Sequence, residues 1–171
     1  MTDKNLLVIT PHRKEPGKQR IAAYCRVSSR SDEQLNSLAN QIDFYRSRFE
    51  SDDTVVFVSI YAEEGLSGTQ AESRPQFMKM IEDCRSGHID CIWTKSVSRF
   101  GRNTVDTLIY TRELRSLGID VFFEKENIHS TESSGELMLT LMAAFAESES
   151  EAMSENIKWG KRRRYEQGIT G

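Results

Sequence analysis

Histidine and cysteine are scarce in this sequence, and their scarcity narrows the chemistry that it can perform. The 171 residues include three histidines and three cysteines. The histidines are scattered along the chain at positions 12, 88 and 129, so a histidine-based catalytic triad is not expected. Cys25, Cys84 and Cys91 are odd in number and have no metal-binding spacing, which favours reduced thiols over a disulfide framework. We therefore expect no metal and no cofactor.

Long apolar runs are also missing. No stretch approaches the roughly 18 apolar residues that cross a membrane. The first residues lack the apolar core and the small-residue cleavage site of a signal peptide. Since 37% of the residues are hydrophobic, the chain is long enough for one domain with a core. These features predict a cytoplasmic location and no membrane partner.

The sequence has no excess of positive charge, because its formal net charge is −3. This value argues against a protein that coats DNA non-specifically. The charge is uneven, however: residues 132–155 are rich in glutamate, and a basic run follows at Lys158, Lys161, Arg162, Arg163 and Arg164. Such runs usually form a solvated helix face.

Strand and helix patterns alternate along most of the chain. Residues 1–19, with Pro11, Pro16 and Gly17, indicate a flexible lead-in. Short β-branched or aromatic runs predict strands at 20–27, 54–62, 89–94 and 119–123. Apolar spacing and capping residues predict helices at 34–50, from a Ser73 cap to near Gly87, and from an Asn103 cap to Leu117. The result is an α/β domain over residues 20–132, with a mostly parallel four- to five-stranded sheet flanked by helices.

Residues 133–168 predict one long helix that projects from this domain. Its first half is apolar, and a thinner stripe continues through Ala152, Met153 and Ile157. We expect the first half to pack partly on the sheet and partly on another copy of the protein. The alternative is an ordinary terminal helix that frays. A DNA-binding region is expected beyond residue 171.

Side chains suited to phosphate chemistry follow the first three predicted strands. Ser28 and Arg26 end the first strand, Glu63 ends the second, and Lys95, Ser96 and Arg99 follow the third. Because the carboxyl ends of parallel strands meet at one edge, we expect these groups to converge. A serine needs help to become a nucleophile, and a phosphate needs cations around it. With no compact acidic cluster to hold a metal, the guanidinium groups of Arg26, Arg74, Arg99 and Arg102 are the candidate cations.

Five ordered motifs give these residues a family context. They are Tyr24-Cys25-Arg26-Val27-Ser28-Ser29, Asn36-Ser37-Leu38-Ala39-Asn40-Gln41, Tyr61-Ala62-Glu63-Glu64-Gly65-Leu66-Ser67-Gly68, Arg74-Pro75-Gln76-Phe77 and Ser98-Arg99-Phe100-Gly101-Arg102-Asn103. Through them the chain resembles the serine recombinases of the resolvase/invertase type, over residues 20 to about 165. It looks most like the large members, which include phage integrases and mobile-element transposases.

The resemblance implies a mechanism. Ser28 would attack a DNA phosphodiester and form a 5′-phosphoserine bond, and strand exchange and religation would need neither metal nor ATP. Arg26, Arg99 and Arg102 would hold the phosphate, Arg74 would belong to the same cationic set, and Gln41, Glu63 and Ser67 would line the site. A homodimer would occupy each double-stranded crossover site and a homotetramer the synapse. Members of this family assemble through the long helix, and its stripe predicts an interface at Met142, Phe145, Glu149 and Met153. We also predict DNA contacts at Lys95, Lys158, Lys161, Arg162, Arg163 and Arg164.

Some positions depart from the family pattern, and the sequence leaves alternative interpretations of the nucleophile and of the function. Many members carry Asp at the positions of Glu63 and Ser98, and Arg at the position of Ser150. Ser29 is an alternative nucleophile if the first strand ends differently. A non-catalytic assembly or regulatory module of the same fold is the alternative function. A phosphotransferase or nucleotide-binding domain is disfavoured, because no glycine-rich loop follows the first strand.

Overall fold

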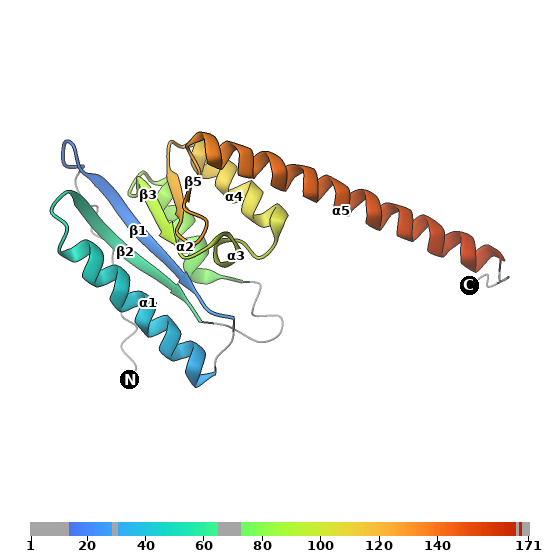
Figure 1. Ribbon diagram of the computed structural model, residues 1–171, viewed down its shortest axis with the longest axis horizontal. Helices are drawn as coiled ribbons and strands as arrows, with labels where there is room; N and C mark the ends of the chain where they lie inside the picture. The colour runs from blue at the N-terminus through green and yellow to red at the C-terminus, as the bar shows by residue number, and fades with distance from the viewer. Residues whose placement is uncertain (1–13, 29–30, 65–72, 167, 169–171) are drawn as a thin grey trace.

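The computed structural model describes residues 14–28, 31–64, 73–166 and 168, which contain one five-stranded sheet with helices on both faces (Figure 1). The strands lie in the order β2 (Val55–Glu63), β1 (Gln19–Arg26), β3 (Cys91–Thr94), β4 (Asp120–Phe123) and β5 (Ile128–His129). The first four are parallel, and only the two-residue β5 runs antiparallel to its neighbour β4. The predicted mostly parallel sheet is confirmed.

Two apolar layers hold the helices on the sheet. Along β1 the side chains alternate, so that Ala23 and Cys25 face one layer and Ala22 and Tyr24 the other. The first layer lies under α1 (Asp32–Glu50), with Tyr45 and other aromatic side chains. The second lies under α2 (Pro75–Arg85), α3 (Val97–Phe100) and α4 (Thr104–Ser116).

The start of α2 differs from the prediction. Arg74, not Ser73, is the N-cap, and its side chain makes no capping bond. Instead the carboxylate of Glu63, at the end of β2, accepts hydrogen bonds from the backbone N–H groups of Gln76 (3.0 Å) and Phe77 (3.1 Å). A carboxylate at a helix N-terminus satisfies free N–H groups and complements the helix dipole. The serine cap was therefore wrong because a neighbouring strand supplies the acceptor.

The boundaries of α4 follow the prediction. The side-chain oxygen of Asn103 accepts a hydrogen bond from the backbone N–H of Asp106 at 2.8 Å, as an N-cap does. Beyond the other end, Gly118 has a φ of 74°, a conformation that side chains with a Cβ rarely adopt. The Asn103 cap therefore fixes the loop that joins α3 to α4.

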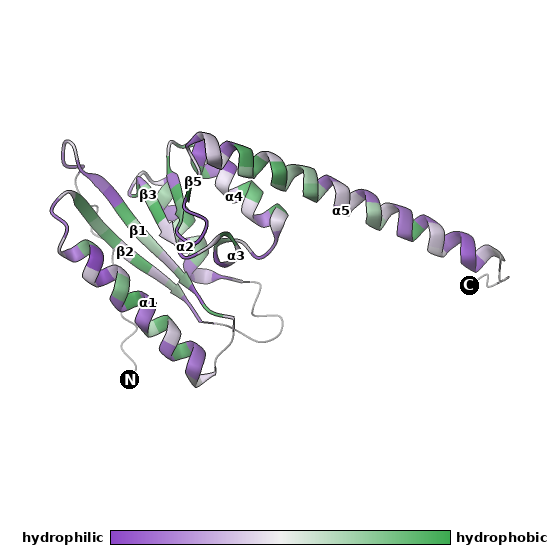
Figure 2. Ribbon diagram, in the orientation of Figure 1, coloured by the Kyte–Doolittle hydropathy of each residue, from purple (hydrophilic) through white to green (hydrophobic). Residues whose placement is uncertain are grey.

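The long helix α5 (Ser133–Glu166) projects from the domain, as predicted (Figure 1). Its 34 residues span about 50 Å at the usual helical rise. Its first turn lies close to the chain after β5, since a Cβ on Gly135 would stand 2.3 Å from the carbonyl oxygen of His129. Every residue from Glu147 to Trp159 is exposed, and Figure 2 shows the helix becoming more hydrophilic toward its end. Among the described residues, no helix has the length and apolar character that a membrane span requires.

Candidate active site

The carboxyl ends of three parallel strands meet at one edge of the sheet. Arg26, the last residue of β1, is in register with Glu63, the last residue of β2, and β3 lies on the other side of β1. Ser28 follows two residues after Arg26 and is exposed. The polypeptide after β3 forms the short helix α3, which carries Arg99. Segments that are distant in sequence therefore end at the same edge of the sheet as Ser28.

Arg26 ties the end of β1 to α3. Its Nε donates a hydrogen bond to the carbonyl oxygen of Arg99 (3.1 Å), and its Nη2 donates to the carbonyl oxygens of Ser98 (2.7 Å) and Gly101 (3.3 Å). These carbonyls belong to the C-terminal turn of α3, where a cation is favourable. Burial lowers the pKa of Arg26, and the positive charges of Arg74 and Arg99 act in the same direction. Arg26 thus orients the α3 segment relative to the loop that carries Ser28.

Arg74 is buried beneath this surface, with 4% of its area exposed. Its Nη1 contacts Asp106 Oδ2 at 2.8 Å, and its Nε and Nη2 donate to the hydroxyl oxygen of Tyr24 at 3.3 and 3.2 Å. Nη2 also donates to the carbonyl oxygen of Phe100, and the guanidinium carbon lies 3.7 Å from the centre of the Phe77 ring. In this conformation the protein itself satisfies Arg74, whose place in the cationic set around the phosphate stays a prediction.

Glu63 and Tyr24 continue the buried network. The Tyr24 hydroxyl donates to Glu63 Oε2 at 3.2 Å. Burial raises the pKa of Tyr24 to about 12, against the opposing effect of the Arg74 charge, so the phenol stays protonated. Glu63 accepts this bond in addition to its two bonds from the α2 N-terminus. It therefore joins β1, β2 and α2 from below the surface, and its predicted role in lining the site stays untested.

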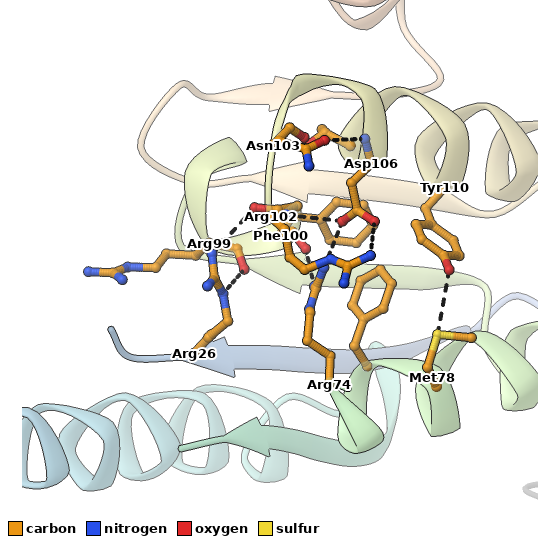
Figure 3. Close-up of polar contacts among 12 residues, drawn as sticks. Arg26, Arg74, Met78, Arg99, Phe100, Arg102, Asn103, Asp106 and Tyr110 are labelled. Atoms are coloured by element: carbon orange, nitrogen blue, oxygen red, sulfur yellow. Dashed lines mark hydrogen bonds and ion pairs between the residues drawn. The ribbon is translucent and has the colours of Figure 1, made fainter. Parts of the chain in front are cut away.

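Arg99 and Arg102 present guanidinium groups nearer to solvent. The side chain of Arg102 is 41% exposed, and its Nη2 lies 3.3 Å from Asp106 Oδ1. Arg99 makes no side-chain hydrogen bond or ion pair with any residue that the structure describes. Figure 3 shows its guanidinium extending away from the Asp106 cluster. Both arginines come from the segment that follows β3 at this edge of the sheet.

The remaining predicted site residues have different surroundings. Gln41 is half-buried on α1, and its side-chain oxygen is buried without a donor among the described residues. Lys95 is exposed, and Ser67 lies outside the described residues. Within residues 14–28, 31–64, 73–166 and 168, no group of three or more His, Cys, Asp or Glu side chains could hold a metal ion.

The three cysteines are buried and free. Burial raises the pKa of Cys25 and Cys84 to about 12, and it raises the pKa of Cys91 as well. The thiolate is the reactive form of cysteine. Ser28 at the strand end is accordingly a better candidate nucleophile than the neighbouring Cys25.

The long helix passes close to the arginine-bearing loop. Met142 lines a cavity of about 360 Å³ together with Ser98 and Arg102. Glu149 lines another of about 330 Å³ that also contains Arg102 and the exposed Ile109 of α4. Two other predicted interface residues, Phe145 and Met153, are 66% and 68% exposed. The predicted basic run is exposed near the end of α5 and consists of Lys158, Lys161, Arg162, Arg163 and Arg164.

Asp106 is the site residue that sequence reasoning missed. It contacts both Arg74 and Arg102, yet only its position three residues after Asn103 is visible in the sequence. That spacing is typical of the first turn of a capped helix and gives no hint of the contact with Arg74.

Comparisons with known proteins identify the family and the fold of this chain. Residues 21–170 match the family model described as "Resolvase, N terminal domain". Transposon Tn552 DNA-invertase BinR and Tn552 resolvase, both from Staphylococcus aureus, are 35% identical to this chain over 98 residues. That stretch is 56% of this chain and 50% and 48% of the two proteins, so the chain spans about half the length of these relatives.

Solved structures extend the likeness over nearly the whole chain. A resolvase family site-specific recombinase from Streptococcus pneumoniae has a TM-score of 0.73 and 27% identity, covering 87% of this chain and 99% of that one. The N-terminal catalytic domain of TP901-1 integrase shares the fold, with a TM-score of 0.60 and 24% identity over 78% of this chain and 98% of its own. Because the family model spans most of the sequence, this chain belongs to the resolvase N-terminal domain family.

Proposed function

We propose that this chain is the catalytic part of a site-specific DNA recombinase with Ser28 as its nucleophile. One observation carries the proposal. Ser28 is exposed just past β1, at the sheet edge where the α3–α4 segment brings Arg99 and Arg102. Family membership indicates the class of reaction, and the hydroxyl and the guanidinium groups at this edge of the sheet are the groups that the reaction needs.

The proposed reaction exchanges one phosphodiester for another. The Ser28 oxygen bonds to phosphorus, the bond from phosphorus to the 3′ oxygen breaks, and the serine proton ends on that oxygen. A 5′-phosphoserine and a free 3′-hydroxyl result. Attack of a 3′-hydroxyl on the phosphoserine reverses the step, so rejoining consumes no ATP. Arg99 and Arg102 stabilise the charge that develops on the phosphate oxygens.

The long helix supports the proposed assembly. Phe145 and Met153 are large apolar side chains that face solvent on a helix with a sustained stripe. We assign this stripe to contacts between copies: a homodimer on each crossover site and a tetramer when two sites pair. The basic run from Lys158 to Arg164 follows the stripe and is assigned to DNA phosphates.

The test is a covalent adduct on DNA. The natural-length protein is incubated in EDTA with end-labelled duplexes that it has selected from fragments of its host genome. We expect a protein–DNA species that survives denaturant, and a free 3′-hydroxyl that terminal transferase can extend. Ser28→Ala should bind the same duplexes and form no adduct. A wild-type protein that pairs two duplexes without forming an adduct would favour the non-catalytic module.

A further inference from the structure

Asp106 lies where an ordinary helix-capping role would be expected. It is the third residue of α4, after the N-cap Asn103, and its Oδ2 accepts a hydrogen bond from the backbone N–H of Arg102 at 3.0 Å. An acidic side chain at this position commonly reaches back to a free N–H before the helix. This bond alone requires no charge on Asp106, since a neutral amide oxygen can accept it.

The contacts of Asp106 with two arginines, by contrast, require a negative charge. The same carboxylate pairs with Arg74 Nη1 at 2.8 Å and with Arg102 Nη2 at 3.3 Å, as Figure 3 shows. The Asp106 side chain is 7% exposed and that of Arg74 is 4% exposed. Asp106 is the one carboxylate within ion-pair distance of Arg74 in the described part of the chain. Because an uncompensated buried charge is costly, the place of Arg74 depends on Asp106.

Arg102 is held differently. Its side chain is two-fifths exposed, and its bond to Asp106 restrains the guanidinium. The Asp106 backbone is fixed by Asn103, and its carboxylate is fixed by the buried Arg74. A rigid buried pair thus acts as the anchor for a more exposed arginine.

We infer that Asp106 is a positioning residue for DNA cleavage, which acts by holding the Arg102 guanidinium at the phosphate site while Arg74 locks Asp106 from below. The inference rests on the proposed function. It gives buried Arg74 a role that does not require contact with DNA. It also explains why the two arginines meet on one carboxylate rather than on separate ones.

Asp106→Asn tests the charge with little change of shape. The amide oxygen can still accept the bond from the Arg102 N–H, but the anion that pairs with both guanidinium groups is lost. We expect adduct formation on saturated DNA to slow about 100-fold, the scale for misplacing a reacting group by about 1 Å. The affinity for DNA should not change.

Asp90→Asn is the matched control. Asp90 forms an equally close pair with Arg20, with Nη2–Oδ1 at 2.9 Å and Nε–Oδ2 at 3.0 Å. That pair lies at the start of β1, at the other end of the strand from Ser28. The control should lower the melting temperature and leave the rate of adduct formation as in wild type.

Two further variants keep the test informative if Asp106→Asn does not fold. Asp106→Glu retains the charge that Arg74 needs but displaces the Arg102 contact, and it should fold and still slow adduct formation. Combined with Arg102→Ala, the Asp106→Glu change should add little to the loss caused by Arg102→Ala alone. Additive losses would instead indicate a structural role only and overturn the inference.

The outcomes separate this inference from the proposed function. An adduct in wild type together with a wild-type rate in folded Asp106→Asn or Asp106→Glu would overturn the positioning role and leave the recombinase in place. No adduct in wild type would overturn the proposed function and the inference with it. Slow cleavage with unchanged DNA affinity in the Asp106 variants, together with a wild-type rate in Asp90→Asn, supports the inference.

Discussion

Two arginine–aspartate pairs lie toward opposite ends of the sheet, and their surroundings differ. Asp90 takes three bonds from Arg20 alone, from its backbone N–H, Nε and Nη2, so the pair is complete in itself. Asp106 instead shares its carboxylate between Arg74 and Arg102. The Arg20–Asp90 pair stabilises the fold, whereas the carboxylate of Asp106 also orients the more exposed guanidinium of Arg102. The second arrangement occurs at the edge where α/β sheets place their ligands.

The largest expected difference between the two ends is in catalysis. Arg99→Ala removes a carboxyl-edge cation that has no bond to a described side chain, and we expect adduct formation to fall about 100- to 1000-fold. The control is Arg48→Ala: on α1, the Arg48 guanidinium stacks 4.9 Å from the Trp93 ring. The control should cleave at the wild-type rate. Equal losses in the two variants would remove the distinction drawn for this edge.

The next difference is in self-association, which concerns the helix that leaves the carboxyl edge. Phe145→Glu places a charge on the exposed stripe of α5, so we expect a dimer to become a monomer in analytical ultracentrifugation. Ala144→Glu adds the same charge to the adjacent residue, about 100° around the helix, and should remain dimeric. Because both residues are exposed in the single chain, neither change should disturb the fold of the monomer, which circular dichroism would check. A dimer that survives Phe145→Glu would place the interface elsewhere.

The two pairs should also differ in stability. Asp106→Asn leaves the buried Arg74 charge without its partner, and we expect it to lower the free energy of unfolding by about 3–5 kcal/mol. Asp90→Asn breaks a pair that is more exposed, with side chains 10% and 25% exposed, and should cost about 1–3 kcal/mol. Urea unfolding of both variants gives the comparison. The reverse order would mean that Asp106 contributes less to the fold than its burial implies.

The smallest effect concerns acid stability. Hydrogen bonds from Arg20 lower the pKa of Asp90 below its ordinary value of 3.8. As the pH falls, the Asp90 carboxylate is therefore protonated in the unfolded chain before it is protonated in the folded protein. The stabilisation from the Arg20–Asp90 pair is full above pH 3.8 and is lost as the pH falls through the folded-state pKa of Asp90. Wild type should lose more stability than Asp90→Asn as the pH falls below that value. Parallel curves from urea unfolding at several pH values would show that the pair contributes no pH dependence.

Local patterns predicted the framework of the molecule. The β-branched runs gave four of the five strands, Asn103 marked the start of α4, and the uninterrupted stripe after Ser133 gave the projecting helix. These features depend on neighbours within a few residues, which a sequence displays directly. The two-residue β5 carries no comparable signal, because its pairing with β4 supplies its structure.

The interior of the site was not predictable in the same way. Glu63 caps α2 across 13 and 14 residues, and Arg74 meets Asp106 across 32. Such contacts depend on how the strands are ordered in the sheet, so neither spacing nor charge pattern reveals them. The sequence indicated which arginines to consider, but not that Arg74 is buried while the Arg99 guanidinium extends away from the Asp106 cluster.

The most direct test of the central claim is to identify the residue that carries the DNA. The adduct formed in EDTA is digested with nuclease and protease, and the phosphorylated peptide is sequenced by mass spectrometry. We predict a phosphoryl group on Ser28, and none in Ser28→Ala, with Ser29→Ala behaving as wild type. A phosphoryl group on Ser29, or an adduct that persists in Ser28→Ala, would contradict the assignment of Ser28 as the nucleophile.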